Sequence, residues 1–497
     1  MDCEVVVVGG GIGGLTVAAL LAQRGVNVCL FERQSEVGGC AVSFNKFDHI
    51  FEQSHGLYSS WESNEIHQRI FAELPVQPPE VQELNPTYAV RLPDQSQVLI
   101  GRDTDQFEQN LREVFPECRD AAIDFFQELN VAGTTLRQLL RENPAFLSAS
   151  KAGRTYKLLG LGKAGAKILA SAGEPVATRL ETLPFRFRCF VDAQLQTLAQ
   201  GNSSQVPYLY AALAFAEARQ GVFAIRGGGA ALATRLAESI RSSGGSIRLD
   251  SPVLRLAYDS SGRALGVDLL SGEKVTASKA IVSNLTVWDT YGKLVGLNRT
   301  PLAMRKALQT LRGWGAYLIF LSLDEVAAEA LASDRVLAVN QWQSDQPYDP
   351  ENHQLFFNAA SVWDPRAPVG KRAITVHAFT DVEEWFTFHS NNEASEAQDQ
   401  RMLEACWERL HQAMPELGDR VEVIDTVNPL GYYEATRRKL GMVGGVVPTG
   451  SEFWATQPPY TTALPNLFIV NDTTTPGGVA AVSRAALLLA NKLAPQS

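Results

Sequence analysis

The sequence predicts an α/β fold in which a Rossmann-like nucleotide-binding domain is interrupted by an inserted mixed α+β domain. Three observations predict it. A strand, a glycine-rich turn, a helix and a second strand occupy residues 5–40, and another glycine turn opens a helix at residues 227–229. Near the end of the chain, a strand, an acidic residue and a Gly-Gly pair precede the last helix, within residues 464–494. A chain of 497 residues is long enough for about two or three domains.

The first segment carries a dinucleotide-binding pattern. A run of valines, typical of a parallel strand buried on both faces, ends just before Gly9. Gly9, Gly11 and Gly14 then permit a tight turn, a close approach of the backbone to a pyrophosphate, and close packing of helix on strand. Ile12 and Gly13 stand at the start of the helix, where unpaired N–H groups favour a phosphate.

The second strand, at residues 26–31, ends at an acidic residue. The carboxylate of Glu32 is placed to accept hydrogen bonds from a ribose diol. Arg33 follows, and Gly38 and Gly39 allow the chain to fold back beside the pyrophosphate. This complete pattern resembles the FAD-binding fingerprint of the glutathione reductase and amine oxidase superfamily, and the resemblance implies FAD as the cofactor.

A second segment fits the same superfamily. The glycine turn at 227–229 opens an amphipathic helix that Gly244 and Gly245 end, and strands follow. The resemblance implies that this segment returns to the FAD domain and that the backbone near Val253 meets the adenine. The strand of residues 279–284 closes the segment at Asn284, which we include among the cofactor-binding residues.

The third segment is C-terminal. Asp472 follows an apolar strand, where an acid can hold a ribityl hydroxyl. Gly478 and Val479 open the last helix, whose N–H groups would point at the N1–C2=O edge of the isoalloxazine ring.

These segments predict a discontinuous FAD-binding domain of residues 1–70, 221–300 and 421–497. Residues 71–220 and 301–420 are then the substrate-binding domain. The elements expected in it are helices at 103–115, 121–140 and 398–414 and strands at 316–323, 355–360 and 372–380.

Residues 151–173 are unlike their surroundings. Five basic residues and no acidic residue occur there, with leucines between them, in a chain of net charge −10. The segment is a candidate for membrane-surface contact, with a solvated lid as the alternative. Its glycines argue against one regular helix.

Two stretches narrow the resemblance. "IVSNLTVWDTYGKLVG" (281–296) and "PGGVAAVSRAA" (476–486) are similar to the corresponding stretches of phytoene desaturases, carotenoid isomerases and retinol saturases. The resemblance implies an FAD-dependent oxidoreductase that desaturates, saturates or isomerises a long apolar carotenoid, retinoid or other isoprenoid-like substrate, with hydride exchange at flavin N5. The chain departs from the family's pattern at Glu52, where Asp is usual, and at Ser54, where Gly is usual.

His55 is the candidate catalytic residue, because "EQSHGLY" follows the first FAD segment and is expected to approach the ring. No Ser-His-Asp arrangement and no metal-ligand spacing is visible, so we predict no metal site. Two alternatives remain open. One is a soluble amine-oxidase-like enzyme acting on a smaller polar amine, with aromatic residues from "YYEATRR" (432–438). The other is a non-catalytic lipid- or prenyl-binding relative.

Composition excludes some classes. The net charge of −10 disfavours nucleic-acid binding. No secretory signal and no run of about 18 apolar residues is visible. Six dispersed cysteines favour reduced thiols in a cytoplasmic protein, peripheral to the membrane if residues 151–173 contact it. The electron acceptor is left open.

Overall fold

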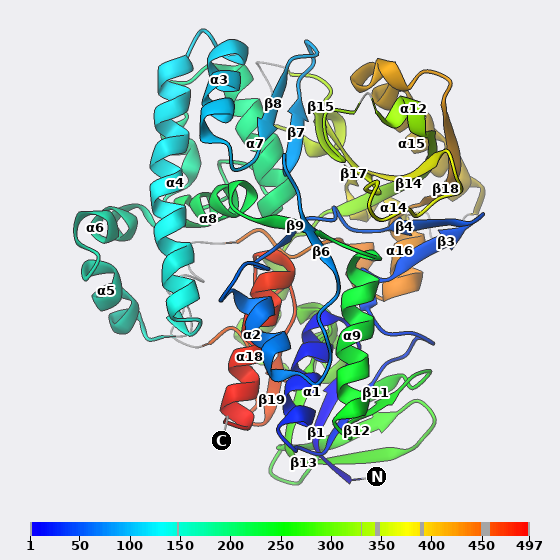
Figure 1. Cartoon of the computed structure of the whole chain (residues 1–497). Coiled ribbons are helices and arrows are strands. Elements are labelled where there is room, and N and C mark those ends of the chain that lie inside the picture. Colours follow the sequence, from blue (N-terminus) through cyan, green and yellow to red (C-terminus); the bar gives the residue numbers. More distant parts are fainter. Residues whose placement is uncertain are drawn as a thin grey trace.

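The computed structural model describes residues 2–146, 149–329, 331–342, 348–387, 392–448 and 458–495. Two seven-stranded sheets lie at opposite ends of the molecule, each with its own helices (Figure 1). The first sheet is largely parallel and the second largely antiparallel. The predicted α/β class is confirmed.

The first sheet gathers strands from three distant parts of the chain. Its order is β10-β2-β1-β13-β12-β11, with β19 also paired to β13. Val6 of β1 pairs in parallel with Cys29 of β2 on one side and Ile281 of β13 on the other. The strands are β1 (Asp2–Val8), β2 (Val28–Phe31), β10 (Ser246–Arg248), β11 (Val253–Tyr258), β12 (Ala264–Leu269), β13 (Lys274–Ser283) and β19 (Leu467–Ile469).

Both faces of this sheet are covered, as the valine run predicted. Val5 and Val7 contact a layer of three helices, α1 (Ile12–Gln23), α9 (Gly228–Ser242) and α18 (Gly478–Leu493). Val6 and Val8 face the opposite core, which contains Trp288 and Tyr291. Full burial of a β-branched run stabilises the sheet by roughly 1.5–3 kcal/mol per side chain.

The second sheet has the order β18-β14-β17-β16-β15-β7-β8. One face packs on α15 (Asn392–Ala413) and the short α12 (Glu325–Ala328). The other packs on the helical layer that includes α7 (Phe185–Ala199) and α8 (Tyr208–Arg219). The strands are β7 (Tyr88–Arg91), β8 (Gln97–Ile100), β14 (Gly315–Asp324), β15 (Arg335–Val339), β16 (Gln354–Ala359), β17 (Lys371–Thr380) and β18 (Val421–Val427).

Two small sheets lie between the large ones (Figure 1). The sheet β5-β9-β6 joins β5 (Tyr58–Ser59), β9 (Val222–Ile225) and β6 (Val81–Glu83), and β3 (Ser43–Lys46) pairs with β4 (His49–Glu52). The other helices are α2 (Ile66–Glu73), α3 (Thr104–Val114), α4 (Arg119–Glu142), α5 (Lys151–Leu159), α6 (Gly162–Ser171), α10 (Val287–Asp289), α11 (Leu302–Thr310), α13 (Pro350–His353), α14 (Val382–Thr387) and α16 (Pro429–Thr436). Short helical turns of 3-10 or π type are η1 (Gly39–Ala41), η3 (Val176–Arg179), η4 (Thr290–Leu294), η5 (Pro415–Leu417) and η6 (Lys439–Gly441).

The predicted domain boundaries stay a prediction. The strands of the first sheet come from ranges assigned to the FAD-binding domain, and β7, β8 and β14–β17 come from ranges assigned to the substrate-binding domain. The strand β18, within the range 421–497, pairs with β14 in the second sheet.

The expectation of dispersed reduced thiols is wrong for one pair. Cys3 and Cys29 form a disulfide between neighbouring strands of the first sheet. An irregularity in β1 between Cys3 and Val5 brings Cys3 to the same face as Cys29. Cys40, Cys118, Cys189 and Cys406 are free.

Residues 151–173 form two short helices, α5 and α6, with a break at Gly160 and Gly162, as the glycines indicated. In the described part of the chain, no helix combines the length and apolar character needed to span a bilayer.

Candidate functional site

A single cavity of about 1060 Å³ extends from the first sheet towards the second. Its lower part lies at the carboxyl ends of β1, β2 and β13, and its upper part lies between α7, α8 and β17. Nearly every site residue predicted from the sequence lines it: His55, Gly9, Gly11, Ile12, Gly13, Glu32, Arg33, Gly38, Gly39, Val253, Asn284, Asp472, Gly478 and Val479. Gly14 is the one predicted site residue that does not line the cavity.

The glycine turn is packed too tightly for side chains. Gly9 has φ +98°, in the region that favours glycine. A Cβ on Gly14 would lie 2.3 Å from the Gly9 carbonyl oxygen, and one on Gly11 would lie 2.5 Å from Asn284 Oδ1. The turn therefore depends on glycine both for its conformation and for its close approach to Asn284.

Glu32 ties the end of β2 to this turn. Its Oε2 accepts the N–H of Gly10 at 2.7 Å, and its Oε1 accepts the N–H of Gln34 at 2.9 Å. The residue is only 8% exposed. Arg33 points elsewhere, since its guanidinium donates to the backbone carbonyls of Glu434 and Ala435; burial lowers the pKa of Arg33 from its usual value.

The second glycine pair lies against the first turn. Gly38 donates its N–H to the Gly10 carbonyl at 2.8 Å, and a Cβ on Gly39 would lie 3.2 Å from the Cα of Gly11. Both residues have positive φ. The chain folds back here as the sequence predicted.

Asn284 joins the three segments. Its N–H donates to the Val8 carbonyl at 2.8 Å, and its Nδ2 donates to the Val470 carbonyl at 2.6 Å. One residue, placed after β13, thus contacts the carboxyl end of β1 through its backbone and the carboxyl end of β19 through its side chain. This arrangement holds the open end of the cavity together.

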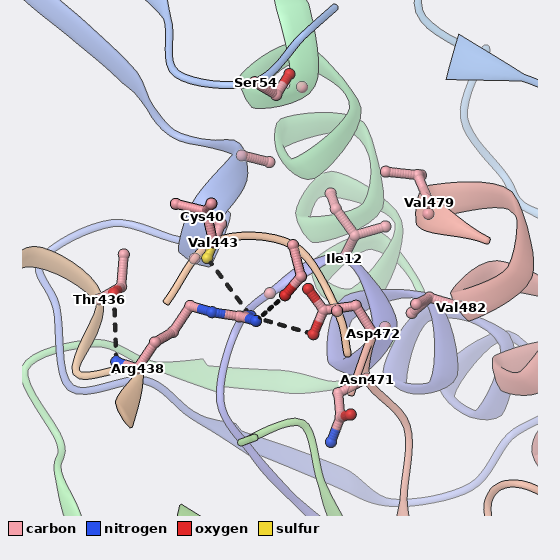
Figure 2. Close-up of a pocket in the computed structure, with 18 of the residues that line it drawn as sticks. Ile12, Cys40, Ser54, Thr436, Arg438, Val443, Asn471, Asp472, Val479 and Val482 are labelled. Carbon is pink, nitrogen blue, oxygen red and sulfur yellow. Dashed lines mark hydrogen bonds and ion pairs between the residues drawn. The ribbon is translucent and has the colours of Figure 1, made fainter. Parts of the chain in front are cut away.

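Asp472 has a partner that sequence reasoning missed. Arg438 contacts both Asp472 and Cys40 (Figure 2). Its Nη1 lies 3.1 Å from Asp472 Oδ1 and 3.8 Å from Cys40 Sγ. Burial opposes the charge of Arg438, yet the neighbouring Asp472 holds the pKa of Arg438 above its usual value. No local pattern announces this pairing, because it joins residues more than thirty positions apart.

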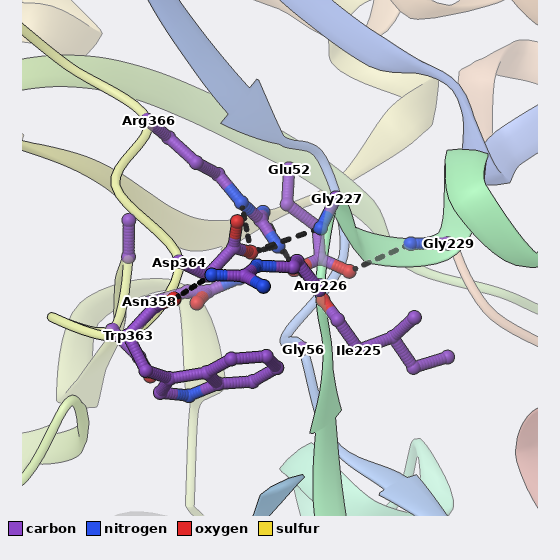
Figure 3. A network of polar contacts seen from close by, with 12 residues as sticks. Glu52, Gly56, Ile225, Arg226, Gly227, Gly229, Asn358, Trp363, Asp364 and Arg366 are labelled. Carbon is purple, nitrogen blue, oxygen red and sulfur yellow. Dashed lines mark hydrogen bonds and ion pairs between the residues drawn. The ribbon is translucent and has the colours of Figure 1, made fainter. Parts of the chain in front are cut away.

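The helix ends suit a nucleotide. The N-terminal residues of α1 and α18, preceded by Gly11 and Gly477, receive no side-chain cap and lie at the cavity. By contrast, the N-terminus of α9 is filled by carboxylates: Gly227 N–H donates to Asp364 and Gly229 N–H to Glu52 (Figure 3). An open helix N-terminus stabilises a pyrophosphate or an electron-accepting ring. The carboxylate of Glu32 can bind a ribose, and the glycine turn lets the backbone approach the pyrophosphate.

The carboxylate of Glu52 belongs to a buried network. Arg366 reaches both Glu52 and Asp364, and Tyr58 donates its hydroxyl to Glu52. Burial opposes ionisation, yet Arg366 and Arg335 hold the pKa of Glu52 below its usual value. Glu52 stands where Asp is usual in the family, and it has a structural role here because its carboxylate accepts the Gly229 N–H at the start of α9.

His55 faces the upper cavity from a loop that two hydrogen bonds fix. Asn358 Nδ2 donates to the Ser54 carbonyl at 2.6 Å and Arg335 Nη2 to the Gly56 carbonyl at 3.5 Å. Gly56 has φ +65°, and a Cβ there would lie 2.7 Å from Arg335 Nη2. Burial lowers the pKa of His55 to about 4, so its imidazole is neutral at ordinary pH.

The upper cavity is mostly apolar. One face of α8 supplies Tyr210, Leu213, Ala214, Glu217 and Ala218. Their spacing is that of one helical stripe, but α8 is apolar on most sides, so the stripe does not stand out in the sequence. Other apolar lining side chains are Leu57, Leu198 and Phe379.

Aromatic residues shortly after His55 in the sequence, and those of the segment 432–438, separate into two groups. Tyr58 and Tyr432 line the cavity. Trp61 is buried against His67 and Phe71, and Tyr433 packs on Phe386. The segment 432–438 therefore supplies a single aromatic side chain to the cavity wall.

The comparisons with known proteins agree with this geometry. Residues 12–493 match the family described as flavin containing amine oxidoreductase. A prolycopene isomerase of Arabidopsis thaliana is 25% identical, over 99% of this chain and 82% of its own. An all-trans-retinol 13,14-reductase of Danio rerio is 24% identical, over 86% of this chain and 75% of its own. A solved oxidoreductase from Methanosarcina mazei has the same fold, with a TM-score of 0.63, 18% identity and coverage of 98% and 99%.

Proposed function

The chain belongs to the flavin-containing amine oxidoreductase family and is an FAD-dependent oxidoreductase, and we propose that its substrate is a long apolar molecule of the isoprenoid kind. The observation that carries this proposal is the continuation of the cavity. Beyond the part lined by the glycine turn and Glu32, the cavity passes between Leu198, Leu213 and Phe379, whose side chains offer hydrocarbon contacts. Apolar surface of this kind favours a hydrocarbon chain over a small polar amine.

The names of two relatives support the same substrate class. They are named prolycopene isomerase and all-trans-retinol 13,14-reductase. We propose desaturation, saturation or isomerisation of such a substrate. Bound FAD supplies hydride acceptance and return at its N5 position.

The residues of the chain divide the work of binding. We propose that Glu32 accepts hydrogen bonds from the adenosine ribose and that the open N-terminus of α1 receives the pyrophosphate. Asp472 is assigned a ribityl hydroxyl, and the N–H groups of Gly478 and Val479 the N1–C2=O edge of the ring. Val253, the first residue of β11, is assigned the adenine in this proposal.

His55 orients the substrate and exchanges a proton in this proposal. Its neutral imidazole has one N–H donor and one acceptor nitrogen, and it lines the apolar part of the cavity. The hydrogen bonds to Ser54 and Gly56 fix the loop that carries it.

The α5–α6 hairpin is the proposed contact with a membrane surface. It stands out from the body of the molecule (Figure 1). Tyr156 is 81% exposed and Leu159 55% exposed, beside Lys157 and Lys163. Exposed apolar side chains with lysines are attracted to anionic lipid. Lys157→Glu with Lys163→Glu should therefore reduce co-sedimentation with anionic vesicles, while Lys274→Glu, on the distant β13, should not; equal binding of both variants would refute the contact.

The substrate proposal is tested with a charge placed in the apolar part of the cavity. We expect FAD-loaded protein to bind a carotenoid or retinoid and to return an altered product under anaerobic conditions. Leu213→Glu should abolish this binding and retain FAD, whereas Leu270→Glu, at an exposed position, should change neither. Reduction of the flavin by a small primary amine, with no response to any polyene, would overturn the proposal.

A further inference from the structure

The α8 wall of the cavity carries one acidic side chain among apolar ones. Glu217 lies about one helical turn after Leu213 and Ala214 and directly before Ala218, and all four residues line the cavity. The sequence did not single Glu217 out, because a glutamate near the end of a helix is usually a surface residue. An ionisable group in a mostly apolar cavity indicates a functional role.

The carboxyl group of Glu217 is open to the cavity and has no protein partner. In the part of the chain that the structure describes, neither of its oxygens forms a hydrogen bond or an ion pair, and neither is enclosed by protein. The residue is half-buried and lines the cavity, so a ligand there can reach these oxygens.

His55 belongs to the opposite wall. The upper cavity lies between α8 on one side and β17 on the other. The ring of His55 packs on His377 of β17 and on Phe356 of β16, with centroid distances of 4.7 and 4.4 Å. Across the described ranges, its two ring nitrogens also lack a hydrogen bond and are not enclosed. A molecule lying between the walls therefore has the carboxyl of Glu217 on one side and the imidazole of His55 on the other.

The two groups hold a proton with unequal strength. Burial raises the pKa of Glu217; Arg137 of α4 and Arg484 of α18 oppose this effect, and Glu65 before α2 adds to it. Burial lowers the pKa of His55 to about 4, so its imidazole is rarely protonated at neutral pH. A neutral carboxylic acid is a stronger acid than a neutral imidazole. Glu217 is therefore the better donor and His55 the better acceptor.

We propose that Glu217 is the proton donor of the reaction and that its carboxyl protonates a carbon of a substrate double bond from the α8 wall. The proposal rests on the proposed function and deepens it, because it divides the proton exchange between Glu217 as donor and His55 as acceptor.

The proton and the electrons balance in both reactions that need a donor. In saturation, the electron pair of the π bond forms a C–H bond with the proton of Glu217, and the neighbouring carbon takes a hydride from reduced FAD. The carboxylate left on Glu217 regains a proton from water. In isomerisation, the proton adds to one carbon, the former double bond rotates as a single bond, and the same carboxylate takes the proton back.

The first test follows the proton without any substrate. Infrared spectra of FAD-loaded protein contain the carbonyl stretch of protonated carboxyl groups, and the difference between the unaltered protein and Glu217→Gln isolates the band of Glu217. We expect this band at pH 7 and its loss as pH rises further, because burial raises the pKa. Glu36→Gln, at an exposed acid that lines the same cavity, is the matched control and should remove no such band. Absence of the Glu217 band at pH 7 would overturn the proposal.

The second test follows the reaction. Prolycopene and all-trans-retinol, the compounds in the names of two relatives, are mixed without oxygen with protein whose FAD has been reduced. Glu217→Gln keeps the shape and the neutral charge of the acid, so it should bind both compounds within about twofold of the affinity of the unaltered protein. Its product formation should be slower by about 100-fold or more, as expected for the loss of a general acid. Glu217→Asp should recover part of the rate, and Glu36→Gln should keep all of it.

The outcomes separate the proposal from the function it rests on. Equal rates in Glu217→Gln and the unaltered protein would overturn the donor role while the apolar substrate stands. A product with an additional double bond would do the same, because desaturation removes a proton from carbon. Unaltered protein that binds or converts neither compound would overturn the proposed function itself.

Discussion

Replacement of Glu32 by alanine tests the nucleotide-binding part of the cavity, because the carboxylate of Glu32 makes its most specific contact. The carboxylate accepts the buried Gly10 N–H at 2.7 Å and the Gln34 N–H at 2.9 Å. A hydrogen bond to a charged group contributes about 1.5–3 kcal/mol. Loss of the acceptor proposed for the ribose should therefore weaken FAD binding by about 10- to 150-fold. Loss of the Gly10 contact should separately destabilise the FAD-free protein by a similar free energy.

The two effects are measured separately, by titration of FAD into apoprotein and by urea unfolding without FAD. Glu32→Gln keeps one acceptor oxygen, so its FAD affinity and its stability should lie between those of the unaltered protein and those of Glu32→Ala. Glu36→Ala is the matched control, because Glu36 is an exposed acid on the same cavity wall. An unchanged dissociation constant in Glu32→Ala would refute the role assigned to this carboxylate.

Three further predictions concern the glycine turn, the buried Glu52 and the half-buried Glu217. Gly11→Val should abolish FAD retention, because its side chain would collide with Asn284; Gly292→Val, in open space, should not, and normal flavin absorbance in Gly11→Val would contradict this. Glu52→Gln should lower stability at pH 7 by about 3 kcal/mol, since it removes one of the two carboxylates that pair with the buried Arg366 and leaves only Asp364. Burial alone would raise the pKa of Glu52 in the folded protein, but Arg366 outweighs burial and the pKa is lowered. The difference in stability between Glu52→Gln and the unaltered protein should therefore shrink as pH falls below about 4. A constant difference down to about pH 3 would exclude the ion pair. Burial raises the pKa of Glu217, so the contribution of its neutral form to stability is lost as pH rises. Glu217→Gln should therefore melt at a higher temperature than the unaltered protein at about pH 8 and at an equal temperature at about pH 4. The reverse order would contradict the shift.

The fold and the nucleotide-binding part of the cavity were open to prediction because their contacts are local or repeat a known pattern. Gly9 to Glu32 form one strand–turn–helix–strand unit, and the hydrogen bond from Gly10 to Glu32 closes it. Asn284 and Asp472 were candidates because each stands at or just after the end of a strand that the sequence predicts. The structure brings both to the cavity.

The contacts that escaped prediction depend on pairing between distant strands. His377 meets His55 because β17 lies beside the loop that follows β4, and no spacing in the sequence encodes that neighbourhood. Cys3 and Cys29 are brought together by the register of β1 on β2 and the irregularity after Cys3. Arg438 reaches Asp472 from a turn after α16, and no local sequence pattern encodes a contact between residues so far apart in the chain.

The central claim is that three distant segments hold one FAD whose ring opens on an apolar space. An experimental structure of the FAD-loaded protein tests it most directly. We predict the adenosine ribose at Glu32, the pyrophosphate at the start of α1, and the ring between Val479 and the apolar wall of Leu213 and Phe379. A bound FAD with its ring turned away from that wall, or protein that takes up no FAD at all, would contradict the account.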